Sequence, residues 1–271
     1  MIPRAYVIEW QHSAPWPGDD QIEQDLILSR ILVDIYQNEY LNKQLLFRGG
    51  TALNKLFFTD PIRYSEDLDF VQKKSGPIKE IVKTIQGLID PWLGASSTQP
   101  RKDGFRIYYQ FIPESDPEGK KRIKIEINTR EHFSVFPIKE MNFEVKSQWF
   151  TGASQLNTYE LTEMLGTKMR ALYQRKKGRD LFDINWALKH HSVKYKDIIK
   201  SFHKYMEYGG HSVSAAQYFA NLENKLDDPI FCKDIDNYKR NDIDYDINNA
   251  FENIKGLSES FSECHFFVTY L

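Results

Sequence analysis

Acidic side chains in the first half of the chain have a spacing that suits phosphate chemistry. Asp67 and Asp69 stand two residues apart in a segment that alternates polar with apolar residues. On a strand, residues two apart point to the same face, so these carboxylates would repel each other unless a cation lay between them. A hard cation such as Mg²⁺ or Mn²⁺ prefers oxygen ligands of this kind. An isolated pair with this spacing is more often a solvated surface feature, so it needs support from other residues.

Glu126 is a third candidate ligand. The segment from Arg122 to Asn128 alternates strictly, with isoleucines on one face and Lys124, Glu126 and Asn128 on the other. Glu126 would therefore lie mid-strand on a polar face, where it could join a metal site or simply face solvent. Two metal ions about 4 Å apart clamp both ends of an in-line phosphoryl displacement. We predict that Glu126, together with the aspartate pair, forms a catalytic metal site.

A glycine pair precedes these carboxylates. Gly49 and Gly50 stand before Thr51 at the start of a predicted helix, where backbone N–H groups and the helix dipole favour an anion. Glycine also lets a phosphate approach where a Cβ atom would collide. Arg63 and Ser65, just before the aspartates, carry further donors. We predict that these five residues contact the phosphates of a nucleoside triphosphate, although a lone Gly-Gly is more often a tight turn.

The predicted elements around these motifs are mixed. An irregular arm over residues 10–18 leads to a helix that Asp19 or Asp20 would cap, and Pro77 opens another helix that Pro91 would end. A turn-rich segment over residues 113–119 would join two strands as a hairpin. The expected helices and strands of this half cover residues 22–35, 45–47, 51–58, 67–71, 78–88, 105–112, 122–128 and 143–145.

From about residue 158 the pattern becomes helical. Expected helices cover residues 159–173, 180–189, 195–208 and 212–226, and residues 227–249 carry no clear assignment. The sequence therefore predicts an α+β fold. Residues 1–150 would form a mixed α/β domain, a small mixed sheet flanked by helices, that carries the motifs. Residues 151–271 would form a helical domain that completes the active-site cleft.

Composition excludes several classes of protein. Hydrophobic residues make up 41% and charged residues 27% of the 271 residues, as in an ordinary globular protein, and the net charge of −2 gives no sign of nucleic-acid binding. Cys232 and Cys264 match no zinc spacing and are too few for a disulfide framework. The sequence has no apolar run long enough for a membrane span and lacks the P-loop, GxGxxG, HExxH and GxSxG motifs. We expect a soluble, cytoplasmic protein.

The motifs together resemble a known family. The run FRGGTALNKLF, followed by RYSEDLDF, resembles the AbiEii/MenT nucleotidyltransferase toxins, a branch of the DNA polymerase β-like superfamily. The resemblance extends from the arm at residue 10 to about residue 190, through KMRALYQRKKGRDLFDI. It implies a nucleotidyltransferase fold for the first half, NTP and Mg²⁺ as cosubstrates, and a bacterial toxin of a toxin–antitoxin or phage-defence pair with a cognate antitoxin. Glu126 stands where the family's pattern has an aspartate.

The helical half adds three candidates. Lys168 falls on an apolar helical stripe, where a lysine either extends to the edge or faces a buried anion. Asp180 and Asp183 are three residues apart and share a face; the alternative for Asp180, in the first turn, is that it only complements the helix dipole. The resemblance implies that Lys168 contacts the triphosphate and that Asp183 positions the triphosphate or the base.

A basic run separates these residues: Arg175, Lys176, Lys177 and Arg179. Such a run is usually a solvated loop, but beside a nucleotide site it could guide an RNA backbone. His190 and His191 fit a helix end better than a metal site.

The functional prediction is metal-dependent transfer of a nucleoside monophosphate from an NTP to an acceptor hydroxyl. The resemblance favours RNA, in particular the 3′ end of tRNA, and leaves a protein acceptor open. One alternative is a kinase-like or hydrolytic enzyme on the same metal site, since carboxylate pairs also serve nucleases. Another is a catalytically silent NTP-binding interaction module, against which the presence of all three carboxylates argues.

Overall fold

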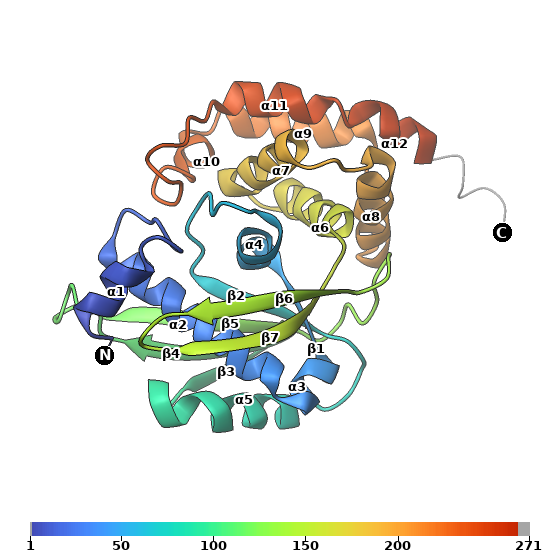
Figure 1. Ribbon diagram of the computed structural model, residues 1–271. Helices are drawn as coiled ribbons and strands as arrows, with labels where there is room; N and C mark the ends of the chain where they lie inside the picture. Colours follow the sequence, from blue (N-terminus) through green and yellow to red (C-terminus); the bar gives the residue numbers. More distant parts are fainter. Residues whose placement is uncertain (1, 265–271) are drawn as a thin grey trace. The chain divides into compact units, whose positions relative to one another are not determined.

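The computed structural model describes residues 2–264 (Figure 1). The chain forms two compact units. The first comprises Met1–Ser134 and Ile138–Tyr159, and the second comprises Val135–Pro137 and Glu160–Leu271.

A seven-stranded mixed sheet forms the centre of the first unit, with the strand order β3-β4-β5-β2-β1-β7-β6. The pairs β2–β5 and β1–β7 are parallel, and the other pairs are antiparallel. The strands are β1 (Leu45–Arg48), β2 (Asp67–Gln72), β3 (Ser97–Arg101), β4 (Gly104–Phe111), β5 (Lys121–Asn128), β6 (Lys139–Lys146) and β7 (Thr151–Thr158). The predicted α+β fold is confirmed.

The helical segments of this unit pack against the sheet, and the first of them packs mainly against the second (Figure 1). They are α1 (Arg4–Trp10), α2 (Asp19–Gln37), α3 (Glu39–Gln44), α4 (Gly49–Ala52), the π-helical turn η1 (Leu53–Phe57) and α5 (Ile78–Leu93). The apolar residues of β5, namely Ile123, Ile125 and Ile127, are fully buried, which leaves the intervening polar residues on the opposite face of the strand.

The hairpin of β4 and β5 and the edge strand β6 form as predicted. Two predicted helix boundaries were wrong. The residue before α2 that takes the N-cap position is Gly18 rather than Asp19 or Asp20. Pro91 lies inside the last turn of α5, and the helix continues to Leu93 before Gly94 turns the chain with a φ of +97°.

Seven helices make up the described part of the second unit. They are α6 (Leu161–Gln174), α7 (Gly178–His190), α8 (Tyr195–Tyr208), α9 (Ala215–Leu226), α10 (Pro229–Lys233), α11 (Ile247–Lys255) and α12 (Ser258–Cys264). The unassigned residues 227–249 contain the short helix α10 and a series of turns. Phe202, Tyr218 and Phe261 form an aromatic cluster in the core of this unit, in which Phe202 meets each of the other two rings edge to face.

Gly166 allows α6 and α8 to approach closely. A Cβ atom there would lie 2.5 Å from Ser201 Cβ and 2.8 Å from the backbone of Ile198 and Phe202. We expect Gly166→Ala to reduce the free energy of unfolding by about 1–3 kcal/mol through overpacking. Gly87 in α5 is the matched control, since a Cβ atom there meets no heavy atom within 4 Å. Gly87→Ala should stabilise by about 0.5–1 kcal/mol. Denaturant unfolding measures the free energy of unfolding of both variants. Equal changes in the two variants would contradict the close contact between α6 and α8 at Gly166.

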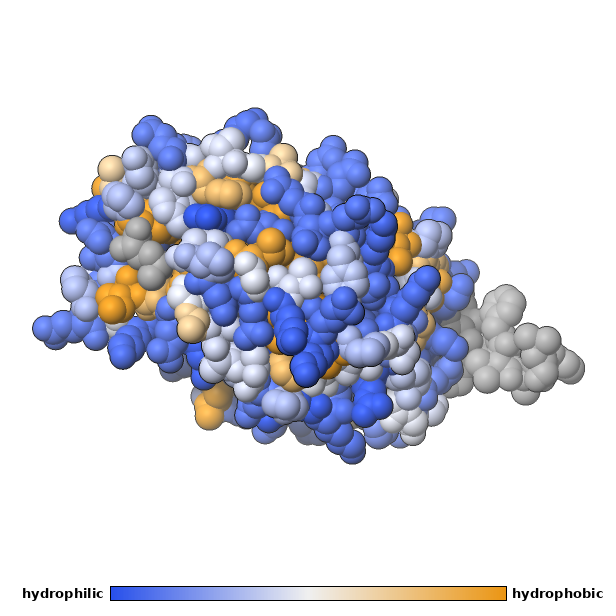
Figure 2. Space-filling model, turned by 90° about the horizontal axis from the view of Figure 1, so that it is seen from below, coloured by the Kyte–Doolittle hydropathy of each residue, from blue (hydrophilic) through white to orange (hydrophobic). Residues whose placement is uncertain are grey.

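The surface is mainly polar on the face that Figure 2 shows, where hydrophobic residues form small, separate patches. Among the helices of residues 2–264, none is long and apolar enough to cross a membrane. Cys232 is a free thiol that contacts the carbonyl of Leu226, and the side chain of Cys264 lies outside the described part.

Candidate active site

Strand pairing brings the three predicted carboxylates onto one face of the sheet. β2 and β5 are parallel neighbours, and their register pairs Asp69 with Glu126 and Asp67 with Lys124. Leu68, between the two aspartates, is fully buried on the other face. The side chains of Asp67, Asp69 and Glu126 therefore share the polar face of adjacent strands.

Two basic residues lie among these carboxylates. Lys124 Nζ is 3.0 Å from Asp67 Oδ2 and 3.0 Å from Glu126 Oε2. Arg106 on β4 binds Glu126 through both carboxylate oxygens, with Nε at 2.9 Å and a terminal nitrogen at 3.0 Å. The sequence analysis predicted no role in the site for Lys124 or Arg106. The alternation that places Glu126 on the polar face also places Lys124 there, and the hairpin register adds Arg106.

The carboxylates differ in their electrostatics. Burial raises the pKa of Asp67 to about 6, with Lys124 opposing the shift and Asp69 adding to it. Burial also disfavours the charged form of Glu126, but the hydrogen bonds from Arg106 and Lys124 outweigh it and lower the pKa of Glu126. Burial likewise opposes the charge of Lys124, whose pKa the two aspartates nevertheless raise to about 12. The charge of Glu126 is therefore well compensated, whereas that of Asp67 is only partly compensated by Lys124.

This donor set fits a hard divalent cation. Asp67 and Asp69 supply oxygen atoms only, and Mg²⁺ typically binds one or two carboxylates together with substrate phosphates. Among residues 2–264, no three acidic, histidine or cysteine side chains converge as a complete ligand set. The arrangement thus suits a cation held by the aspartate pair and completed by phosphate oxygens, with Glu126 bound to Arg106 beside it.

Gly49 and Gly50 leave room for two polar side chains that approach the backbone closely. Gly49 has a φ of +85°, and a Cβ atom there would lie 2.5 Å from Asp69 Oδ2. A Cβ atom on Gly50 would lie 2.2 Å from a terminal nitrogen of Arg63. The glycines therefore let the start of α4 approach both Asp69 and the buried guanidinium of Arg63.

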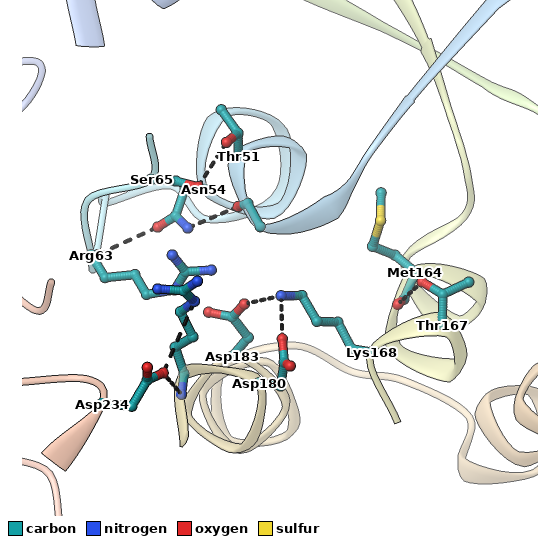
Figure 3. Close-up of polar contacts among 12 residues, drawn as sticks. Thr51, Asn54, Arg63, Ser65, Met164, Thr167, Lys168, Asp180, Asp183 and Asp234 are labelled. Atoms are coloured by element: carbon teal, nitrogen blue, oxygen red, sulfur yellow. Dashed lines mark hydrogen bonds and ion pairs between the residues drawn. The ribbon is translucent and has the colours of Figure 1, made fainter. Parts of the chain in front are cut away.

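The loop before β2 is tied to α4 and η1 (Figure 3). Thr51 Oγ1 donates to the Asp67 carbonyl and shares a second hydrogen bond of 2.7 Å with the hydroxyl of Ser65. Asn54 accepts from the backbone N–H of Arg63 at 3.4 Å and donates to the Gly50 carbonyl at 2.9 Å. The structure therefore groups the five predicted phosphate contacts around one helix start, next to the aspartate pair.

An ion pair that the sequence did not indicate lies beside Asp69. Arg48 at the end of β1 pairs with Asp69 in the sheet register, and its guanidinium is 2.6 Å from Glu131 Oε2. Burial disfavours the charge on Arg48, but Glu131 outweighs this and raises the pKa of Arg48. Nothing in the local sequence indicates this contact, because 83 residues separate the partners.

A buried ionic cluster occupies the second unit. Lys168 Nζ is 2.9 Å from Asp180 Oδ1 and 2.7 Å from Asp183 Oδ2 (Figure 3). The residues are 6%, 0% and 0% exposed, respectively. Arg175 donates to both oxygens of Asp180, at 2.7 and 2.8 Å. A lysine on this apolar stripe was expected either to extend to the edge of the helix or to face a buried anion. The structure shows the second arrangement, and the anions that Lys168 faces are Asp180 and Asp183 of the same unit.

Asp180 should make stability depend on pH. Burial opposes its ionisation, but Lys168 and Arg175 outweigh burial and lower the pKa of Asp180 well below its usual range. A lowered pKa in the folded state gives stability that is present above the ordinary pKa near 4 and is lost as pH falls. We expect the free energy of unfolding to fall from pH 5 towards pH 2 with a smaller slope in Asp180→Asn than in the wild type. Denaturant titrations across this range test it, and equal slopes would contradict it.

The basic run between α6 and α7 is paired with acidic residues rather than free. Lys176 lies 3.1 Å from Asp228, and Lys177 lies 3.3 Å from Asp234. The backbone N–H of Arg179 also donates to Asp234, at 3.2 Å. These acidic partners come from the stretch without a predicted structure, so the run anchors α10 and the following turns. His190 ends α7, as predicted.

Comparison with solved structures supports the fold. The structure is similar to that of MenT4, a nucleotidyltransferase toxin from Mycobacterium tuberculosis H37Rv, with a TM-score of 0.58 and 16% identity over 97% of this chain and 99% of that one. It is also similar to JHP933 from Helicobacter pylori, with a TM-score of 0.54 and 13% identity over 92% of this chain and 95% of that one. Comparison with curated proteins finds no match.

The family comparison is the more specific result. The model of the nucleotidyl transferase AbiEii toxin family, described as a type IV toxin–antitoxin system, matches residues 30–255. This range includes the glycine pair, the carboxylates on β2 and β5, and the ionic cluster of the second unit. The family resemblance of the motifs is thereby confirmed, and the chain belongs to the AbiEii family of nucleotidyltransferase toxins.

Proposed function

We propose that this toxin transfers a nucleoside monophosphate from an NTP to an RNA hydroxyl in a metal-dependent reaction. The observation that carries the proposal is that the parallel register of β2 and β5 sets Asp69 beside Glu126, while the start of α4 brings Gly49 against the same Asp69 side chain. In the reaction, the acceptor oxygen would bond to the α-phosphorus while the bond to the pyrophosphate leaving group breaks.

In this proposal the residues of the first unit have distinct tasks. Asp67 and Asp69 would hold Mg²⁺ or Mn²⁺, which when bound offsets phosphate charge and favours the ionised form of a hydroxyl. Thr51, Ser65 and the N–H groups at the start of α4 would bind and orient the phosphates. Glu126, the third predicted metal ligand, accepts hydrogen bonds from Arg106 and Lys124 and would hold both of these side chains beside the aspartate pair.

Lys168 and Asp183 keep the roles that the family resemblance implies: Lys168 would contact the triphosphate, and Asp183 would position the triphosphate or the base. A 3′ end of tRNA as acceptor, neutralisation by a cognate antitoxin and a cytoplasmic location belong to the same proposal. They rest on family membership rather than on a contact in this chain.

The test is incubation with each of the four NTPs, labelled at the α- or γ-phosphate, with Mg²⁺ and either total RNA or tRNA. The proposal expects the α-label to become fixed to RNA and pyrophosphate to be released. Fixation of the γ-label would indicate a kinase, and fixation of the α-label to protein would indicate a protein acceptor. Release of labelled phosphate without fixation would indicate a hydrolytic enzyme, and neither fixation nor release from any nucleotide would favour the silent binding module.

A further inference from the structure

The polar face that carries the aspartate pair continues across the next three strands of the sheet. β5, β4 and β3 follow β2 in the strand order, and all four strands belong to the first unit. The register pairs Glu126 of β5 with Arg106 of β4, and Arg106 with Gln99 of β3. Because neighbouring strands lie about 4.8 Å apart, this face extends roughly 14 Å from the aspartates to β3.

This face is open to solvent away from the aspartates. β3 is exposed along its whole length, and Gln110 of β4 and Arg122 of β5 are exposed as well. The opposite face of β4 is covered by α5 (Figure 1). There the fully buried Tyr109 donates a hydrogen bond of 2.8 Å to Asp90 of α5. The uncovered face can therefore meet a partner, whereas the covered face belongs to the core.

The charge of the open face changes along the sheet. The aspartate pair lies on β2, whereas β3 and β4 contain no acidic residue. The basic residues of this face are Arg101 of β3, Arg106 of β4, and Arg122 and Lys124 of β5. Arg106 and Lys124 bind carboxylates, as described above. Arg101 and Arg122 form no ion pair with an acidic residue among residues 2–264, so these two guanidinium groups can bind an anion from outside.

Tyr108 fixes one of these guanidinium groups. The guanidinium carbon of Arg122 lies 4.8 Å from the centre of the Tyr108 ring, which is a cation–π contact. The Tyr108 hydroxyl donates to Gln99 Oε1 at 3.2 Å, so side chains of β5, β4 and β3 touch in a row across the face. A guanidinium that is held in this way loses less side-chain freedom when it binds a phosphate.

We propose that the polar face of β3, β4 and β5 binds the single-stranded end of the RNA acceptor, with Arg101 and Arg122 contacting its phosphates and its terminal hydroxyl reaching the aspartate pair. Guanidinium groups bind phosphate oxygens through paired hydrogen bonds, and the open face of a sheet is a known support for single-stranded RNA. The net charge of −2 belongs to the whole chain and does not oppose a local basic surface. The inference rests on the proposed function and adds the path by which the acceptor approaches.

Fluorescence anisotropy tests this surface directly. A labelled single-stranded oligoribonucleotide of about eight nucleotides is titrated with the full chain in the presence of Mg²⁺ and an unreactive NTP analogue. The test variant is Arg101→Ala, Arg122→Ala. The matched control is Lys79→Ala, Lys83→Ala, which removes the same charge from exposed positions on α5. We expect the test variant to bind the strand about tenfold or more weakly than the wild type, and the control to bind it like the wild type.

The salt dependence of binding separates lost phosphate contacts from other causes. For a single strand, the slope of log affinity against log salt concentration is about −0.7 for each phosphate contact, so the loss of two contacts should reduce its magnitude by about 1.4. Arg101→Lys, Arg122→Lys keeps both charges and should keep the wild-type slope. Since the substituted positions are exposed, all the variants should keep the wild-type melting temperature to within a few degrees.

Initial rates of α-label fixation provide a second measurement. In the test variant, kcat/KM for RNA should fall about tenfold, in parallel with the affinity for RNA. The KM for the NTP should not change, because neither arginine is among the predicted phosphate contacts of the nucleotide.

Equal RNA affinity in the test variant, the control and the wild type would overturn the proposed surface. Tighter binding of duplex RNA than of the single strand would also overturn it, and so would a wild type that binds no RNA. RNA binding does not depend on transfer. Selective loss of binding in the test variant of a protein that fixes no label would therefore support the surface and count against the proposed reaction alone.

Discussion

Asp69→Asn is expected to reduce nucleotidyl transfer by a factor on the order of a thousand or more while the protein stays folded. The substitution removes the negative charge that would face the cation and changes the side-chain volume little. Asp69 is also the carboxylate that lies against Gly49 and pairs in register with Glu126, so no other acidic residue can take its place without a change in the backbone. Initial rates of α-label fixation, with thermal unfolding in parallel, measure both effects.

Asp103→Asn is the matched control, because Asp103 is an exposed aspartate in the turn between β3 and β4 of the same sheet. It should transfer nucleotide at the wild-type rate. Wild-type activity in Asp69→Asn would show that the reaction does not need the charge of this aspartate pair. A large fall in the melting temperature would instead identify Asp69 as a residue that holds the fold.

Lys168→Met is expected to destabilise the protein by about 3–5 kcal/mol. The substitution keeps the volume of the side chain but leaves Asp183 and Asp180 in the core with one cation fewer. Both carboxylates are fully buried, so water does not compensate them. Lys204→Met, at an exposed position on α8, should change stability by less than about 0.5 kcal/mol. Denaturant unfolding measures both variants.

A second variant separates charge from packing in this cluster. Adding Asp183→Asn to Lys168→Met removes one of the uncompensated charges, so the double variant should be more stable than Lys168→Met alone. If Lys168→Met and the double variant had the same free energy of unfolding, the loss in Lys168→Met would come from changed packing around residue 168 rather than from charge. If Lys168→Met were as stable as the wild type, the ion pairs would not hold α6 to α7.

Local periodicity was enough to predict much of the fold. Strict alternation identified β5 and placed Glu126 on a polar face, and the turn-rich segment before it identified the hairpin with β4. Alternation does not say which strands become neighbours when they are far apart in the chain. The parallel pairing of β2 with β5 sets Asp69 beside Glu126, and it depends on the packing of the whole sheet.

The missed elements lack a local pattern. β3 is exposed along its whole length and contains Pro100, so only its pairing with β4 makes it a strand. β7 (TGASQLNT) has few residues that favour strands, yet it pairs with β6 and β1. Pro91 was taken as a helix end, although α5 continues two residues beyond it despite the backbone hydrogen bond that a proline removes.

The partners of charged residues were the least predictable part of the site. Lys124 and Arg106 surround Glu126 because of strand register, and Arg48 meets Glu131 across a large sequence separation. The sequence indicated a buried anion for Lys168 as one of two possibilities, but the geometry was needed to identify Asp180 and Asp183. Side-chain type and spacing predict which residues share a face, whereas tertiary packing decides which of them form ion pairs.

Binding of Mn²⁺ in the presence of an unreactive NTP analogue tests the central claim most directly. Electron paramagnetic resonance of free Mn²⁺ gives the bound fraction for the wild type and for an Asp67→Asn, Asp69→Asn double variant, with Asp103→Asn as control. We expect the wild type and the control to bind Mn²⁺ together with the nucleotide, and the double variant to lose that binding while its fold is retained. Equal Mn²⁺ affinity in all three proteins would contradict the assignment of the aspartate pair as the metal ligands.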